Sequence, residues 1–145
     1  MQKYKYYERE VNYYETDQMS VVHHSNYARY LEECRIDLMK HYGLPLHLIE
    51  EMGYVIPVLE LHCNYRESIR FGQKIRIVPR VEKMTGVKFD FSYTIYDEKM
   101  ERILHTASTS HCFLNSDFKP VSIKKSEPEL YQKMLDMTES LNDGK

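Results

Sequence analysis

The chain has 145 residues and a formal net charge of −2, with lysine and arginine scattered along its length. This length suits one domain with a sizeable core rather than an enzyme with a separate cofactor domain, and the lack of a basic stripe argues against nucleic acid as a partner. No apolar run reaches the roughly 20 residues that span a bilayer, and the N-terminus has no apolar signal core, so we expect a cytoplasmic protein without membrane contact.

The cysteines suggest neither a disulfide framework nor a metal site. Cys34, Cys63 and Cys112 are far apart, odd in number and set in apolar patterns, which indicates reduced core thiols. The pairs His62-Cys63 and His111-Cys112 look like metal ligands, but adjacent side chains of a strand point to opposite faces of the sheet. We expect no metal and no cofactor.

The first third of the chain predicts a strand followed by two helices. Residues 4–13 mix tyrosine, valine and charge as a strand does, and a loop follows from Tyr14 to Ser25. A long helix is expected from Asn26 to the glycine at position 43, because apolar side chains recur at helical spacing. These are Tyr27, Tyr30, Leu31, Cys34 and Leu38. A shorter helix is expected from Pro45 to about Met52.

The rest of the chain predicts antiparallel strands. Leu59, Leu61, Cys63 and Tyr65 alternate along one face of a long strand. The turn Thr85-Gly86 joins two strands of a hairpin, and Pro79 indicates a bulge or an edge position in the first of them. A final strand is expected from Ile103 to about Leu114. Residues from about 126 to 145 are expected to form a short amphipathic C-terminal helix or a tail.

This order of elements predicts an α+β fold in a single domain, residues 1–145. One long central helix would be wrapped by a curved antiparallel sheet. Because such a unit leaves sheet edges and a helix flank uncovered, we expect a homodimer or a homotetramer.

The loop before the long helix carries the most informative residue, Asp17. A carboxylate beside a helix N-terminus has unpaired backbone N–H groups and the positive end of a dipole next to it. Those amides can stabilise an oxyanion as it develops. An aspartate before a helix also commonly serves only as a cap or a turn residue.

The segment around Asp17 resembles the hotdog-fold acyl-CoA thioesterases of the 4-hydroxybenzoyl-CoA thioesterase type. The matching residues, in order, are Val11, Tyr13, Glu15, Thr16, Asp17, Met19, Val21, Val22, His24, Asn26, Tyr27, Tyr30, Glu32 and Arg35. The agreement continues more loosely, by element order, through about Pro120. One departure is Ser20, where the family usually has glycine. If that position needs positive φ, serine costs free energy there.

The resemblance implies a hotdog fold and hydrolysis of a fatty or aromatic acyl thioester to free acid and CoA. It identifies Asp17 as the catalytic carboxylate and assigns supporting catalytic roles to His24 and Tyr13. Asp17 would act either as a nucleophile or as a general base, and the sequence leaves both open. The N–H groups of His24 or Ser25 would bind the carbonyl oxygen.

The carrier of the acyl group is also left open. Ser25 and Arg66 are candidate substrate-binding residues, and cations that would suit the CoA phosphates are Arg66, Arg70, Lys83 and Lys88. An acyl carrier protein is a second possible carrier. Two further functions remain open, a hotdog module that binds acyl-CoA without turnover and a dehydratase acting on 3-hydroxyacyl carriers.

Overall fold

A five-stranded antiparallel sheet forms the body of the protein, as a computed structural model of the chain shows for residues 2–142. Its strand order is β1-β3-β4-β5-β2. The strands are β1 (Tyr7–Glu10), β2 (Val58–Tyr65), β3 (Lys74–Met84), β4 (Lys88–Asp97) and β5 (Ile103–Cys112). The hairpin predicted around Thr85-Gly86 is confirmed, because β3 and β4 pair on either side of that turn.

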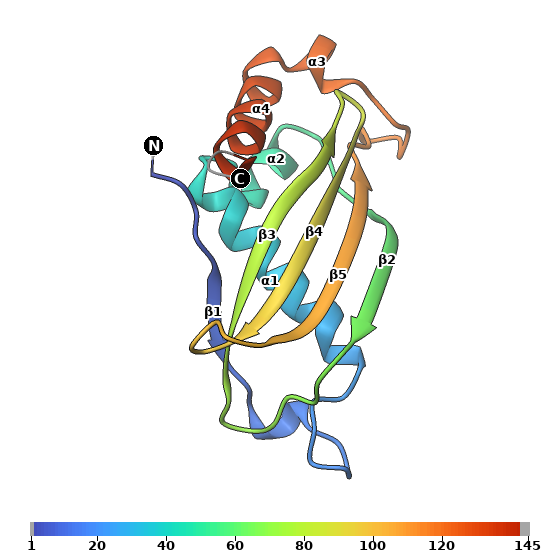
Figure 1. Cartoon of the computed structure of the whole chain (residues 1–145). Coiled ribbons are helices and arrows are strands. Elements are labelled where there is room, and N and C mark those ends of the chain that lie inside the picture. The colour runs from blue at the N-terminus through green and yellow to red at the C-terminus, as the bar shows by residue number, and fades with distance from the viewer. Residues whose placement is uncertain (1, 143–145) are drawn as a thin grey trace.

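The long helix α1 (Ser25–His41) crosses the sheet, which curves around it (Figure 1). The buried face of the helix carries the apolar residues predicted from the sequence, including Tyr30, Leu31 and Cys34 at 0% exposure. Alternate residues of β3 and β4 face the same core, so their burial has the period of two expected of a sheet with one covered face. The hotdog arrangement expected from the resemblance is confirmed.

Shorter elements close the ends of the sheet. They are the 3-10 turn η1 (Tyr13–Glu15) and the helices α2 (Leu46–Glu51), α3 (Ile123–Ser126) and α4 (Pro128–Asn142). The predicted C-terminal helix is therefore present as α4, which packs against β3 with its apolar side chains buried. The prediction extended to residue 145, and residues 143–145 lie outside the described residues. No helix within residues 2–142 is long and apolar enough to cross a bilayer.

Two predicted strands are shorter in the structure. Instead of 4–13, β1 covers Tyr7–Glu10, because the Glu15 N–H bonds to the Asn12 carbonyl at 3.0 Å and closes a 3-10 turn that redirects the chain toward α1. The final strand ends at Cys112, and Leu114 makes only isolated bridges beyond it. All three cysteines are free, as expected, but Cys63 is only half-buried.

The Pro79 prediction is confirmed as an edge position. Within residues 2–142, β1 pairs with β3 only from Lys74 to Ile77, so Pro79 has a neighbouring strand on the β4 side alone. A register shift follows at once between Val81 and Lys83.

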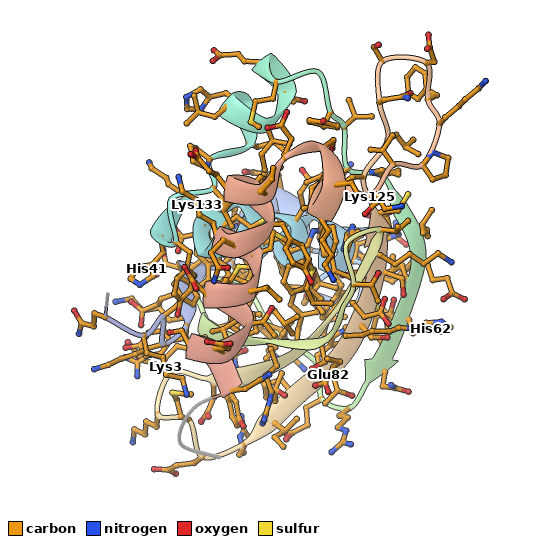
Figure 2. All side chains as sticks on the ribbon, turned by 90° about the horizontal axis from the view of Figure 1, so that it is seen from above. Lys3, His41, His62, Glu82, Lys125 and Lys133 are labelled. Atoms are coloured by element: carbon orange, nitrogen blue, oxygen red, sulfur yellow. The ribbon has the colours of Figure 1, made fainter. Side chains whose placement is uncertain are left out.

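The opposite edge strand, β2, exposes apolar side chains. Val58, Leu59, Leu61 and Tyr65 are 44–56% exposed. Within residues 2–142, β2 pairs only with β5. The helix α4 lies on the other side of the molecule. Seen from above, His62 of β2 and Lys133 of α4 are on opposite sides (Figure 2). An unpaired strand edge with apolar side chains is a surface suited to protein contact.

Candidate functional site

The Asp17 loop, residues Thr16–Val22, is a small hairpin at the end of the molecule opposite α3 and α4 (Figure 1). Thr16 and Val22 form an antiparallel bridge at its base, and the Asp17 N–H bonds to the Val21 carbonyl at 2.9 Å. The Val22 N–H bonds to the Ile69 carbonyl at 2.8 Å, which attaches the hairpin to the segment after β2. The loop predicted from Tyr14 to Ser25 therefore contains a hydrogen-bonded hairpin.

The Asp17 carboxylate is half-buried and serves one visible structural purpose. Its Oδ1 accepts the Met19 N–H at 2.8 Å and the more distant Val21 N–H at 3.5 Å, which is the pattern of an Asx turn. Its Oδ2 makes no hydrogen bond within the described part of the chain. One carboxylate oxygen is therefore held by the turn and the other is available for chemistry.

Ser20 occupies the position where the family usually has glycine, and its φ is +65°. This is the left-handed region, where a side chain costs about 1–2 kcal/mol. The turn therefore requires positive φ at this position, and serine carries the cost in free energy expected from the sequence. The Ser20 N–H closes the turn on the Asp17 carbonyl at 2.9 Å.

The first N–H of α1 donates to the imidazole of His23, a residue for which the sequence suggested no role. Nδ1 of His23 accepts the Ser25 N–H at 3.2 Å and lies 2.9 Å from the Ser25 Oγ. The His23 ring also lies against the His24 ring, with centroids 4.2 Å apart and planes tilted by 30°. Of the two amides expected to bind an oxyanion, that of Ser25 is thus engaged, whereas the His24 N–H has no hydrogen-bond acceptor within residues 2–142.

Three of the predicted site residues make no hydrogen bond to the Asp17 carboxylate within residues 2–142. The Tyr13 ring is 75% exposed and packs edge-on against Phe71, with centroids 5.5 Å apart. The His24 side chain is exposed, and within residues 2–142 neither it nor Tyr13 bonds to Asp17. Arg66 is exposed just after β2, where its N–H bonds to the Leu104 carbonyl at 3.2 Å.

Glu15 and Asn26 were matched in the sequence without a role, and the structure brings them together. Nδ2 of Asn26 donates to the Glu15 carbonyl at 2.8 Å, and the His23 N–H donates to the same oxygen at 2.9 Å. Both residues are buried, Glu15 at 5% and Asn26 at 9% exposure. Their places in the matched segment were the only sequence signal, because nothing local predicts this contact.

A cavity of about 190 Å³, here called the α1 cavity, lies between the second half of α1 and the sheet. Its walls include Met39, Ile56, Phe91 and Val58, and its polar groups include Arg35 and His111. The Arg35 Nη1 donates to the Tyr93 hydroxyl at 3.3 Å. The cavity is mostly apolar with a few polar groups, which is the usual character of a small-molecule pocket.

Two buried histidines of β5 are held in the neutral form. Burial lowers the pKa of His111 to about 4, with a further contribution from the Arg35 charge, and His111 bonds to the Pro57 carbonyl and the Thr109 hydroxyl. Burial alone lowers the pKa of His105 to about 4. Within the described residues, neither nitrogen of His105 has a hydrogen-bond partner.

Comparison with known proteins identifies the family. Residues 11–134 match the family model described as the thioesterase-like superfamily. The structure of a DHNA-CoA thioesterase from Staphylococcus aureus is 31% identical, with a TM-score of 0.89 over 97% of this chain and 95% of that one. A Bacillus subtilis (strain 168) protein, YneP, whose name assigns it provisionally to the acyl-CoA thioesterases, is 31% identical over 84% of this chain and 88% of its own.

A third relative has a more specific name. The 1,4-dihydroxy-2-naphthoyl-CoA hydrolase of Thermosynechococcus vestitus is 26% identical over 74% of each chain. The matched segment contains the Asp17 loop, all of α1 and every strand from β2 to β5. The chain therefore belongs to the thioesterase-like superfamily and is a hotdog-fold thioester hydrolase.

Proposed function

We propose that the protein hydrolyses a fatty or aromatic acyl-CoA to the free acid and CoA, with Asp17 as the catalytic carboxylate. The observation that carries this proposal is the arrangement of Asp17 itself. One of its oxygens is fixed by the turn while the other has no hydrogen-bond partner in residues 2–142, and only His23 and His24 separate the loop from α1.

Two courses of reaction suit this carboxylate. As a nucleophile, Asp17 attacks the thioester carbon, the C–S bond breaks, the thiolate leaves, and water then hydrolyses the mixed anhydride. As a general base, Asp17 takes a proton from a water molecule that attacks the same carbon, and the thiolate leaves as the tetrahedral intermediate collapses. The His24 N–H is the amide best suited to bind the oxyanion in either course, because the Ser25 N–H already bonds to His23.

CoA is the proposed carrier, and the names of the relatives support it. Arg66 is the exposed cation nearest in sequence to the end of β2 and is proposed to contact the CoA phosphates. Tyr13, 75% exposed beside the loop, is proposed to line the approach to Asp17 rather than to bond with it. The three free cysteines support work in the reducing cytoplasm.

We infer that two copies associate through β2. Its outer edge lacks a strand neighbour within residues 2–142, and its apolar side chains are about half exposed, so pairing of two β2 strands would satisfy both the backbone and the side chains. A two-fold axis perpendicular to the sheet, between the two edge strands, makes them antiparallel. The start of one β2 then faces the end of the other.

This symmetry would bring the α1 cavity to the Asp17 loop of the second copy. Val58, at the start of β2, lines the cavity, whereas Tyr65, at its end, packs against Tyr27 in the first turn of α1, with ring centroids 5.0 Å apart. Within one copy, Asp17 and the cavity lie toward opposite ends of α1. We therefore propose that the acyl group enters the α1 cavity of one copy while its thioester lies at Asp17 of the other.

Release of free thiol from a panel of acyl-CoAs tests the proposal. The panel runs from acetyl- to palmitoyl-CoA and includes benzoyl- and hydroxynaphthoyl-CoA. Asp17→Asn should lower kcat by at least about 10²-fold, the usual contribution of a proton-transfer or nucleophilic group. Asp97→Asn is the matched control, because the Asp97 Oδ1 also accepts backbone N–H groups, those of Glu101 and Arg102, but in the β4–β5 turn.

The outcomes separate the alternative functions. Full activity of Asp17→Asn removes Asp17 from the mechanism. A stable complex with intact acyl-CoA and no thiol release over hours indicates a binding module, and turnover of acyl carrier protein thioesters alone changes the carrier. Hydration of an enoyl thioester indicates a dehydratase.

A further inference from the structure

Glu15 is a buried carboxylate two residues before Asp17, and its side chain is fully engaged. It is 5% exposed. The Arg9 Nη2 donates to its two oxygens at 2.7 and 2.9 Å, the Tyr30 hydroxyl donates at 3.0 Å, and the Asn12 N–H donates at 2.8 Å. A buried carboxylate needs such partners, because desolvation of an unpaired charge is costly.

Arg9 links this carboxylate to the body of α1. Its Nη1 donates to both oxygens of Glu33 at 3.0 Å, so one guanidinium joins the end of β1, η1 and the helix. Its guanidinium carbon also lies 4.2 Å from the centre of the Tyr30 ring. A planar guanidinium suits this shared, two-sided contact in a way that a lysine ammonium does not.

The backbone of Glu15 is as constrained as its side chain. Its carbonyl accepts the His23 N–H at 2.9 Å and the Asn26 Nδ2 at 2.8 Å, and Asn26 lies in the first turn of α1. The Asp17 loop begins immediately after Glu15 and ends immediately before His23. One residue therefore fixes both ends of the loop that carries Asp17.

We propose that Glu15 is a positioning residue of the thioesterase site, and that the Arg9–Glu15–Tyr30 network sets the distance between the Asp17 carboxylate and the His24 N–H at the start of α1. This inference rests on the role proposed above for Asp17. Its energetic reason is that a displacement of about 1 Å at a reacting group can cost about 10²-fold in rate. Glu15 itself has no contact with substrate, because its carboxylate is enclosed by these partners.

Three single substitutions test the network. Glu15→Gln keeps the shape of the side chain but presents an amide N–H₂ to the Arg9 Nη2, and Tyr30→Phe removes one hydroxyl without leaving a large void. Arg9→Met removes the charge and keeps much of the apolar stem. We expect kcat to fall about 10- to 100-fold for Glu15→Gln and Arg9→Met, and several-fold for Tyr30→Phe, with KM for the acyl-CoA within about threefold.

The neighbouring pair on β1 supplies the matched control. Glu8 accepts a bond from the Arg76 Nε at 2.9 Å, but this ion pair lies on the exposed face of the sheet. Glu8→Gln should leave kcat within twofold. Unchanged kcat in Glu15→Gln and Tyr30→Phe overturns the proposal, and if Glu15→Gln fails to fold, Tyr30→Phe decides alone.

A double-mutant cycle separates positioning from general destabilisation. If Glu15 acts through Asp17, Glu15→Gln should lower the residual activity of Asp17→Asn by less than about threefold. An equal fold-loss in both backgrounds overturns the proposal. Full activity of Asp17→Asn alone would instead contradict the proposed function, so the two failures are distinguishable.

Hydrogen exchange gives a readout that does not depend on residual activity. Glu15→Gln should speed the exchange of amides in residues 16–24 at least tenfold while those of β3 and β4 stay protected. Unchanged protection in residues 16–24 overturns the proposal even when the double variant has no measurable activity.

Discussion

The ring of His105 stacks on that of Tyr27, with centroids 4.3 Å apart and planes 21° from parallel. His105 is fully buried in β5, and Tyr27 lies in the first turn of α1. The contact therefore joins the sheet to the helix start beside the candidate site. It also places an imidazole without hydrogen-bond partners, within the described residues, in an apolar environment.

The buried imidazole should make the protein sensitive to acid. Burial lowers the pKa of His105 from 6.5 to about 4, so below pH 6.5 the unfolded chain binds a proton that the folded chain does not. Stability should fall as the pH drops from 6.5 toward 4, by up to about 1.4 kcal/mol per pH unit for this residue. His105→Phe keeps the stack and should remove the His105 share of that slope while the share of His111, whose pKa is also about 4, remains, as measured by urea unfolding at several pH values. The same change at the exposed His47 should leave the slope unaltered; an equal slope in His105→Phe would contradict the assignment.

Ser20→Gly should stabilise the protein. Relief of the left-handed strain at φ +65° outweighs the extra backbone entropy that glycine brings to the unfolded chain, and we expect a net gain of about 0.5–1 kcal/mol in the free energy of unfolding. Activity should stay within twofold because the turn is already formed. Ser116→Gly, at a loop position without positive φ, should stabilise nothing, and a similar gain there would refute the strain argument.

Leu61→Lys should disrupt the proposed dimer. Leu61 is 44% exposed on the edge strand β2, where a charge would be desolvated on association. Light scattering after size exclusion should show a monomer, and kcat should fall at least tenfold because each site needs two copies. Phe118→Lys, at a side chain 74% exposed in the loop after β5, should keep both properties. A wild-type protein that is monomeric at micromolar concentration would rule out the composite site.

Ile36→Trp should change acyl selectivity. Ile36 is 42% exposed and lines the α1 cavity, so a larger side chain there narrows the space for the acyl group. We expect kcat/KM for hexanoyl- and benzoyl-CoA to fall at least tenfold, with acetyl-CoA within about threefold. The control is Ile103→Trp, at a residue 37% exposed at the start of β5. A uniform effect on all three thioesters would place the acyl group elsewhere.

Local patterns predict an element well where the burial of each residue follows from its spacing along the helix or strand. The helical period of Tyr27, Tyr30 and Leu31 and the alternation in β3 and β4 both match their burial. The first strand was predicted too long because Asn12 and Glu15 close a turn through a contact that no period encodes. Pro79 was expected at a bulge or an edge position because proline has no N–H to donate, and the structure shows the edge position.

Local spacing and the chemistry of single residues were enough to predict the order of helices and strands, the α+β class, and the position of Asp17 in a loop before a helix. Which side chains meet depends on the packing of the whole chain. Arg9 with Glu15 and Glu33, His105 beneath Tyr27, and the walls of the α1 cavity join residues far apart in the chain. Strand register and the angle at which α1 crosses the sheet set such contacts, and both emerge only when the whole core packs at once.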